Sequence, residues 1–375
     1  MATMSFIASC FAVCLPCLSS TPLLRINKSN FKILRLLGEG AYSYVYLVQA
    51  GDGGLYALKK IRCPFGNENV KTAMKEVDSY REFRSPYIIQ AIDSSVVQEP
   101  DGSKTVYILL PYFQDGSLQD VITKNVVNGQ VISEEEALSL FVGICRGVQS
   151  MHRHHPKTGY TMERSGSTGD QDDLASATES QILLRSEPLE DDEDEVDPFA
   201  DGGSQYGDST ELTETVSFAH RDIKPANIMV SQDGNPVLCD LGSCARAHVT
   251  IKNRAQAITV QELAEEHCTL PYRAPELLDV KVGDELDERI DIWSLGCTLY
   301  ALLYGYSPFE REELENGANI NLAISSGIYS FPANPAYSDG IKDLIRACLE
   351  LDPHERPSIE TILSKAMKLN HRITG

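Results

Sequence analysis

The sequence contains one run whose residue types and spacing could transfer a phosphoryl group, His220-Arg221-Asp222-Ile223-Lys224-Pro225-Ala226-Asn227. Asp222 could orient an attacking hydroxyl and accept its proton, and Lys224 could steady the transferring group. Asn227 stands five residues after Asp222 and could bind Mg²⁺. Thirteen residues after Asn227, Asp240-Leu241-Gly242 offers a carboxylate for a metal ion that bridges phosphates. We therefore predict Asp222, Lys224 and Asn227 as catalytic residues, and Asn227 and Asp240 as metal ligands.

A glycine-bearing stretch lies earlier in the chain, between two segments that read as strands: Leu37-Gly38-Glu39-Gly40-Ala41-Tyr42-Ser43-Tyr44-Val45. Dinucleotide fingerprints and Walker loops open helices, so the strand context disfavours both. A hairpin without Cβ atoms could instead bring backbone N–H groups close to nucleotide phosphates, although a glycine hairpin is also a common plain turn.

The strand that follows carries Tyr56-Ala57-Leu58-Lys59. Lys59 could hold the α and β phosphates of ATP if a carboxylate orients it, and Glu76 on the next predicted helix is placed to do so. Taken alone, Lys59 could equally be a surface lysine on a strand.

The elements that would position these groups divide into two parts. Five strands are predicted at 31–37, 44–48, 56–61, 94–98 and 105–110, with one helix whose apolar residues run from Val70 to Phe83. After Gly116 the pattern becomes mainly helical, and Ser133 with Glu136 predicts a capping box at a helix start. These features predict an α+β protein with two lobes: a small one with five strands and a helix at about 31–113, and a larger helical one at about 114–369.

An acidic segment interrupts the larger lobe. Between His155 and Ser217 the sequence has 17 acidic and 3 basic side chains, and periodicity is absent from about 153 to 217. Such a composition cannot bury enough apolar area to offset its ordering entropy, so we interpret it as a disordered insert. It could be a tolerated, solvated loop, or a docking or autoinhibitory arm.

The order and spacing of these motifs resemble eukaryotic protein kinases from Phe31 to about Leu369, and within them the Numb-associated kinase family. The match is closest to its lipid-anchored branch and the fungal vacuolar-membrane members. It rests on the glycine stretch at 38–45, Leu109-Leu110-Pro111-Tyr112-Phe113, Asp240-Leu241-Gly242-Ser243 and Cys268-Thr269-Leu270-Pro271-Tyr272-Arg273-Ala274-Pro275-Glu276. The glycine-rich motif of protein kinases has a third glycine, and Ser43 stands at that position here. The branch shares this departure.

The resemblance implies the bilobal protein kinase fold and a serine/threonine protein kinase that uses ATP and Mg²⁺, phosphorylates proteins and autophosphorylates. Lys224-Pro225 favours serine and threonine over tyrosine as acceptors. The resemblance also implies Leu110 as gatekeeper and Asp291 as an anchor of the catalytic loop. It further implies an ion pair between Glu276 and Arg356, and a helix at 256–266. The ATP-binding residues expected from motifs and resemblance together are Leu37, Gly38, Glu39, Gly40, Ala41, Tyr42, Ser43, Val45, Ala57, Lys59, Glu76, Leu110, Tyr112 and Phe113.

Cys10, Cys14 and Cys17 lie in an apolar N-terminal stretch that is too short to span a bilayer. We interpret residues 1–30 as a membrane-anchoring segment that is S-acylated at these cysteines, because several acyl chains hold a protein stably where one is marginal. Ala2 excludes N-myristoylation. A secretory signal or an apolar tail that packs on the lobe would be alternatives. The expected location is the cytosolic face of a vacuolar, Golgi or endosomal membrane, with a role in membrane fusion or trafficking.

The overall composition narrows the classes of function and partner that the chain could have. The net charge of −21 argues against nucleic acid as a partner, because phosphates would be repelled. The other seven cysteines are scattered without paired spacing, as in a cytosolic protein with reduced thiols. A pseudokinase scaffold and a small-molecule kinase are the competing functions; oligomeric state is not predicted. The full set of catalytic residues disfavours the scaffold, and the Ala274-Pro275-Glu276 segment disfavours the small-molecule kinase.

Overall fold

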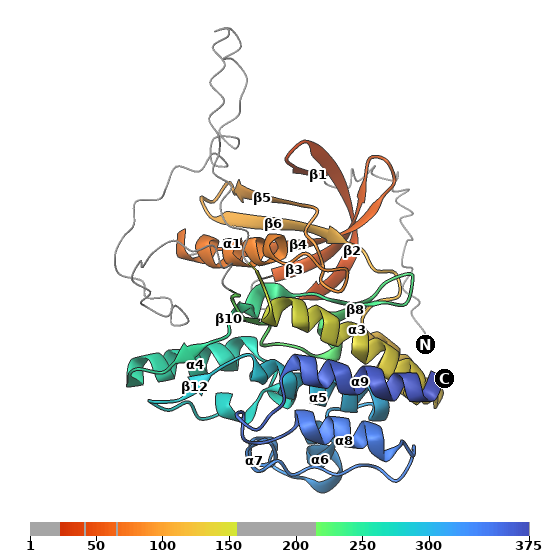
Figure 1. The fold of residues 1–375 in the computed structure, drawn as a ribbon. Helices are drawn as coiled ribbons and strands as arrows, with labels where there is room; N and C mark the ends of the chain where they lie inside the picture. The colour runs from red at the N-terminus through yellow and green to blue at the C-terminus, as the bar shows by residue number, and fades with distance from the viewer. Residues whose placement is uncertain (1–22, 41–42, 65–66, 156–214, 375) are drawn as a thin grey trace, which may run out of the picture.

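The computed structural model describes residues 23–40, 43–64, 67–155 and 215–374 (Figure 1). They form a small lobe built on a sheet and a larger, mainly helical lobe beneath it. The expected bilobal α+β architecture is therefore confirmed. None of the helices in these ranges has the length and apolar character needed to cross a bilayer.

The small lobe contains, within the described residues, a six-stranded antiparallel sheet in the order β1-β2-β3-β4-β6-β5. The strands are β1 (Leu23–Ile26), β2 (Ser29–Glu39), β3 (Ser43–Ala50), β4 (Leu55–Cys63), β5 (Asp93–Gln98) and β6 (Lys104–Pro111). The prediction of five strands is wrong because it missed β1. This strand is only four residues long and falls inside the segment assigned to membrane anchoring, but Ile26 is fully buried and pairs with Ser29.

Two separate cores hold the small lobe together. The inner face of the sheet packs on α1 (Asn67–Glu82), and this packing is continuous with the core of the larger lobe. The other face carries a second core, in which Phe31 and Ile26 from the β1–β2 hairpin cover Leu58 and Tyr107. The hairpin is tied across the sheet where Asn27 Nδ2 donates to Asp93 at 2.9 Å.

The larger lobe is made of helices and short two-stranded pairs. The helices are α2 (Leu118–Asn128), α3 (Glu134–His152), α4 (Arg254–His267), α5 (Arg289–Tyr304), α6 (Pro308–Asn316), α7 (Ile320–Ser326), α8 (Asp339–Cys348) and α9 (Ile359–Thr374). The strands are β7 (Phe218–Ala219), β8 (Ile228–Val230), β9 (Pro236–Leu238), β10 (Ala245–Arg246), β11 (Val249–Thr250) and β12 (Glu285–Leu286). Ser133 caps α3 by accepting from the Glu136 N–H at 3.1 Å, and α4 confirms the helix expected at 256–266.

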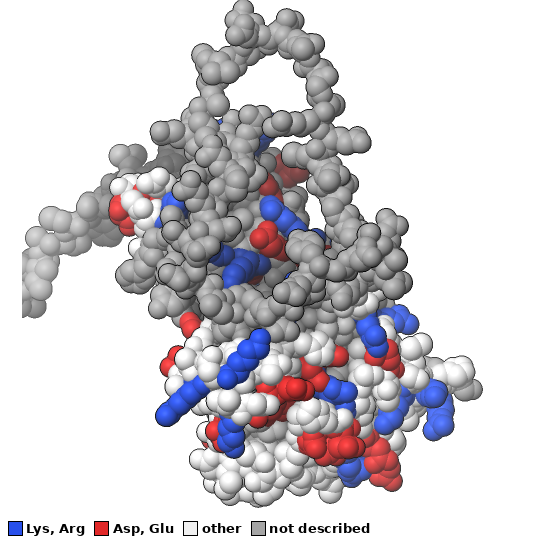
Figure 2. Space-filling model, turned by 60° about the vertical axis from the view of Figure 1, so that its left-hand side comes forward, with Lys and Arg blue, Asp and Glu red and all other residues white. Residues whose placement is uncertain are grey.

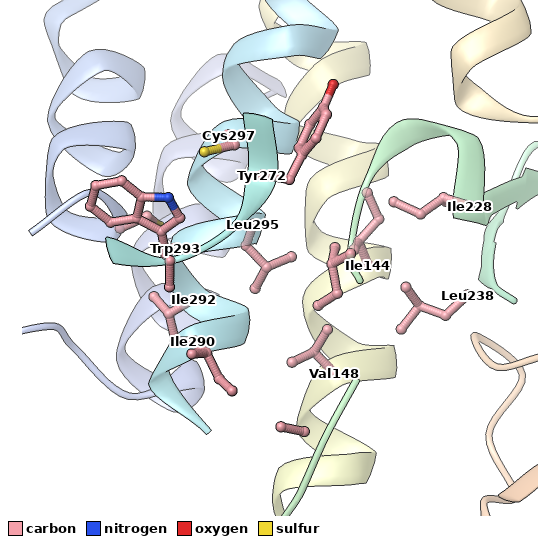
Figure 3. Close-up of a cluster of buried hydrophobic side chains, with 14 of the residues drawn as sticks. Ile144, Val148, Ile228, Leu238, Tyr272, Ile290, Ile292, Trp293, Leu295 and Cys297 are labelled. Atoms are coloured by element: carbon pink, nitrogen blue, oxygen red, sulfur yellow. The ribbon is translucent and has the colours of Figure 1, made fainter. Parts of the chain in front are cut away.

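A buried cluster connects α3 and α5 to the β8–β9 hairpin. Ile144 and Val148 on α3 lie beside Ile228 and Leu238 of that hairpin (Figure 3). The α5 helix is buried over nearly its whole length, and Trp293 stacks on Phe309 with ring centroids 5.4 Å apart. Because β8 directly follows Asn227, this packing supports the loop that carries the predicted catalytic residues.

The boundaries predicted for the acidic insert are wrong at both ends. The Val216 N–H donates to the His154 carbonyl at 2.9 Å, and the two residues form an antiparallel bridge. The rings of Phe83, His154 and Phe218 meet edge to face, with centroids 5.2–5.6 Å apart. Aromatic packing and this bridge therefore place residues 153–155 and 215–217 in the folded lobe. The prediction missed this because it was based on the polar composition of the whole segment. The centre of the predicted insert lies outside the described residues.

The expected ion pair between Glu276 and Arg356 is confirmed deep in the larger lobe. Arg356 Nη1 and Nη2 donate to the two Glu276 carboxylate oxygens at 2.8 and 3.1 Å, and the arginine side chain is fully buried. Its guanidinium also lies 5.3 Å from the Trp293 ring centroid. Removing one member would leave the other as a buried, unpaired charge.

We expect Arg356→Ala to lower the free energy of unfolding by about 3–5 kcal/mol, the usual cost of breaking a buried pair from one side. Chemical denaturation would measure it. Lys281→Ala is the matched control, because Lys281 makes an exposed ion pair with Asp279 and its removal should leave unfolding nearly unchanged. Equal effects of the two substitutions would contradict the structural importance of the buried pair.

Candidate active site

Asp222 is the centre of a hydrogen-bonded group on the loop between β7 and β8. Its Oδ2 accepts from Lys224 Nζ at 2.7 Å and from Asn227 Nδ2 at 2.8 Å. Its Oδ1 accepts from the hydroxyl and the backbone N–H of Thr269 at 2.7 and 3.0 Å. Four donors therefore fix the carboxylate orientation before any substrate arrives.

Asp291 supports this loop from below, as the resemblance implied. Asp291 lies in the first turn of the buried helix α5 and is itself fully buried. Its carboxylate accepts from the backbone N–H groups of His220 and Arg221 at 2.7 and 2.8 Å. His152 Nε2 lies 3.0 Å from the same carboxylate. Burial alone would raise the pKa of Asp291, but the His152 hydrogen bond and the neighbouring positive groups outweigh it and hold the pKa below its ordinary value.

The backbone is strained at two positions of the site. Arg221 and Asp240 adopt positive φ angles of 69° and 59°, a conformation that costs energy for residues with a Cβ. The Arg221 strain is compensated by the Asp291 acceptors and by a 2.8 Å bond from its guanidinium to the Arg246 carbonyl. Such strain concentrates at functional sites, where it aims a side chain.

Lys59 links three elements across the cleft. Its Nζ lies 2.7 Å from Glu76 Oε1 on α1 and 2.8 Å from Asp240 Oδ1, which is 181 positions away in the sequence. Tyr80, one helical turn beyond Glu76, donates its hydroxyl to the same Glu76 oxygen at 3.0 Å. The lysine is thus clamped between one carboxylate of each lobe.

Electrostatics keep these groups charged in spite of burial. Burial by itself lowers the pKa of Lys59, but Glu76 and Asp240 outweigh it and hold the pKa above its ordinary value. Lys59 is the largest cause that holds the pKa of Asp240 below its ordinary range. These two shifts favour a charged Lys59 and a charged Asp240, which is what a phosphate-metal complex would need here.

The remaining expected ATP-binding residues lie on the sheet and the segment that joins the lobes. Strand register sets Val45 opposite Lys59, and Ala57 opposite the buried Leu110. Tyr112 and Phe113 follow directly after β6. Leu37, Gly38, Glu39, Gly40 and Ser43 form the β2–β3 hairpin, which closes where the Gly40 N–H donates to the Ser43 carbonyl at 2.7 Å. Ala41 and Tyr42, like Cys10, Cys14 and Cys17, lie outside the described residues.

The glycine at position 38 has free space beside it. A Cβ built there would meet no protein atom within 4 Å, so packing within the described residues does not require glycine. Its smaller size is useful if another group approaches the backbone, as a phosphate would.

The donor set at the cleft fits a hard divalent cation. Asp240 offers a carboxylate with 47 % of its side chain exposed. The amide nitrogen of Asn227 donates to Asp222, so its amide oxygen is the atom that could bind a metal ion. Among the described residues no group of three or more His, Cys, Asp or Glu forms a metal cage, and Mg²⁺ commonly completes such a sparse site with phosphate and water oxygens.

Two residues with clear positions in the site were missed from the sequence. Thr269 contacts both Asp222 and Lys224, with its hydroxyl 2.5 Å from Lys224 Nζ. Tyr80 supports Glu76. Two positions in the sequence could have indicated them. Thr269 lies six residues before Pro275-Glu276, and Tyr80 lies one helical turn after Glu76, on the same face of the predicted helix.

Comparison with known proteins identifies close relatives over nearly the full chain. Residues 31–156 and 213–367 match the protein kinase domain family. The chain is 42% identical to serine/threonine-protein kinase ENV7 of Saccharomyces cerevisiae, over 94% of this chain and 95% of that protein. It is 38% identical to serine/threonine-protein kinase ppk13 of Schizosaccharomyces pombe, over 91% and 90% of the two chains. It is 31% identical to human serine/threonine-protein kinase 16, over 96% of each.

The clamp around Lys59 generates a titration prediction. In Lys59→Met the pKa of Asp240 should rise above its ordinary value, because the main cause of its depression is gone while burial, which opposes the charge, remains. Carboxyl-carbon NMR as a function of pH would measure it. Lys60→Met is the control, since Lys60 lies on the opposite face of β4. An unchanged Asp240 titration in Lys59→Met would show that other groups set its charge.

Proposed function

This chain belongs to the eukaryotic protein kinase family, in the branch of ENV7 and serine/threonine-protein kinase 16, and is a serine/threonine protein kinase; we propose that Asp222, Lys59 and Asp240 are central to its chemistry. One observation carries the proposal: Lys59 is clamped between Glu76 and Asp240 while Asp222 stands on the facing loop with its carboxylate oriented. Members of this family use ATP and a divalent metal ion. We propose that the metal here is Mg²⁺.

Each group has a role that follows from its contacts. Asp222 would orient the acceptor serine or threonine hydroxyl and take its proton as the oxygen bonds to the γ-phosphorus and ADP leaves. Lys224, 2.7 Å from Asp222, would balance negative charge on the phosphoryl group in transit. Lys59 would hold the α and β phosphates, and Glu76 keeps it in place.

The metal ligands in this proposal are Asp240 and Asn227. When bound, the cation would neutralise charge on the phosphates. The protein's own part is to keep Asp240 ionised through Lys59 and to orient Asn227 through its amide nitrogen on Asp222. The hairpin at Gly38 and Gly40 would cover the phosphates, and the segment after Leu110 would face the adenine.

The deciding experiment is phosphorylation in vitro with purified full-length chain, ATP, Mg²⁺ and a generic protein substrate, with phosphosites mapped by mass spectrometry. Wild type should modify serine and threonine in the substrate and in itself. Lys59→Met and Asp222→Asn should each lose at least about a hundredfold in kcat/KM, since each removes a group needed in the transition state. An Asp222→Asn variant as active as wild type would contradict the role assigned to Asp222.

Thr269 provides a second, finer prediction. Thr269→Val removes the hydroxyl that holds Asp222 and Lys224 but keeps the backbone N–H bond to Asp222. We expect kcat to fall about tenfold or more with little change in the KM for ATP, because only orientation of the acceptor side is disturbed. Thr269→Ser restores the hydroxyl and should recover most of the rate. Equal loss in both variants would contradict the role assigned to the hydroxyl, because Thr269→Ser retains it.

We also propose that the kinase acts at the cytosolic face of an endomembrane, in fusion or trafficking, through S-acylation of Cys10, Cys14 and Cys17. The support is the apolar, cysteine-bearing composition of this segment and the resemblance to the lipid-anchored branch. The segment leads directly into β1, so an anchored chain would hold the small lobe close to the bilayer.

Replacing all three cysteines by serine should move the kinase from the membrane pellet to the soluble fraction of cell lysates, because the acyl chains supply most of the binding energy. Hydroxylamine-sensitive labelling of the wild type would report the thioesters. Cys63→Ser is the control, since Cys63 is buried in the small lobe. If the triple variant still sediments completely with membranes, acylation at these positions is not the anchor.

A further inference from the structure

The outward face of the β1–β2 hairpin carries basic side chains without acidic neighbours in its sequence. Residues 23–32 contain Arg25, Lys28 and Lys32 and no Asp or Glu, in a chain whose net charge is −21. All three side chains are exposed. This local reversal of charge is found where the described chain begins.

Strand pairing gathers part of this charge on one face. Arg25 pairs with Asn30, and Lys32 lies two residues beyond Asn30, so Arg25 and Lys32 are diagonal neighbours. The opposite face of the hairpin holds Ile26 and Phe31 in the second core. The hairpin is therefore amphipathic, and Lys28 in its turn extends the basic side.

An apolar side chain lies close to this surface on β2. The pairing of β1 ends at Lys32, and two residues beyond it Leu34 is 42% exposed. An exposed leucine beside lysine and arginine is typical of surfaces that meet the headgroup region of a bilayer. The hairpin lies at the end of the small lobe farthest from the helical lobe (Figure 1).

The larger lobe offers a contrast. On the face shown in Figure 2, acidic and basic side chains are interspersed over its visible surface, so neither sign dominates there. A negatively charged surface would therefore be attracted chiefly to the hairpin, because the two signs offset each other on the visible face of the larger lobe.

We propose that the β1–β2 hairpin surface, made of Arg25, Lys28, Lys32 and Leu34, docks on an anionic bilayer. This rests on the proposed membrane anchoring and names the second contact that would accompany the acyl chains. Residues 1–22 precede β1 directly and hold the three cysteines, so lipid insertion there delivers the hairpin to the headgroups. One acyl chain is marginal by itself, and a basic patch is an effective second signal.

Docking on this surface need not disturb the groups around Lys59. The hairpin packs on the second core through Ile26 and Phe31, whereas Lys59 lies on the other face of the sheet and contacts Glu76 on α1. A kinase held by the hairpin would stay within reach of proteins on the same membrane.

The test uses full-length protein made without acyltransferases, so that lipid chains do not contribute. Flotation with phosphatidylcholine vesicles, with and without phosphatidylserine, should show binding only to the anionic vesicles, and binding should weaken as salt increases. Lys28→Gln/Lys32→Gln should reduce that affinity roughly thirtyfold, since each basic side chain near an anionic surface contributes about 1 kcal/mol.

Lys365→Gln/Lys368→Gln removes the same charge from exposed positions on α9 and should bind as wild type. Both variants should phosphorylate a soluble peptide normally, which checks folding. Equal binding to neutral and anionic vesicles, or equal loss in the two double variants, would overturn the proposal. So would a chain that ignores anionic vesicles but binds soluble polyglutamate through Lys28 and Lys32, because the occupant would then be an acidic protein. Acylation is tested separately in cells, so either idea can fail alone.

Discussion

The site depends on one ammonium group placed between two carboxylates. Lys59 belongs to the sheet of the small lobe, Glu76 to the helix packed beneath it, and Asp240 to the larger lobe. Two carboxylates on either side of one site would repel each other unless a cation separated them. The lysine therefore joins the two lobes and holds the pKa of Asp240, the proposed metal ligand, below its ordinary value. Tyr80 adds a neutral donor to Glu76 without disturbing that balance.

The second requirement is a rigid support beneath the catalytic loop. Asp291 lies in the first turn of a helix that is buried almost throughout, and its carboxylate accepts two backbone N–H groups from a loop whose Arg221 is in a left-handed conformation. The burial of this helix and the packing of the β8–β9 hairpin offset the energetic cost of that backbone strain. The Glu276–Arg356 pair secures the neighbouring segment, which carries Thr269 at its start, and so connects the core to the orientation of Asp222.

The proposed membrane contact and the proposed chemistry belong to separately packed parts of the small lobe. The face of the sheet that holds Lys59 packs on α1, whereas the other face holds a separate apolar core covered by the β1–β2 hairpin. Because the two cores are distinct, a contact on the hairpin need not disturb the clamp around Lys59. The proposal would let a chain with a net charge of −21 approach an anionic surface through a local group of basic side chains.

The sequence by itself determined the chemistry and most of the elements. The spacing of Asp222, Asn227 and Asp240 predicted which loops would supply the proposed catalytic and metal-binding groups. Local signals such as Ser133 located helix starts, because caps and periodicity depend on neighbours within a few residues. What only the tertiary structure decided involves partners far apart in the chain. The 181-residue separation of Lys59 and Asp240, the contact of Thr269 with Asp222, the pairing of β1 and the ring packing that orders His154 and Phe218 all arise from long-range contacts. Such contacts have no local signature, since their energy comes from burial and pairing that exist only once the lobes are assembled.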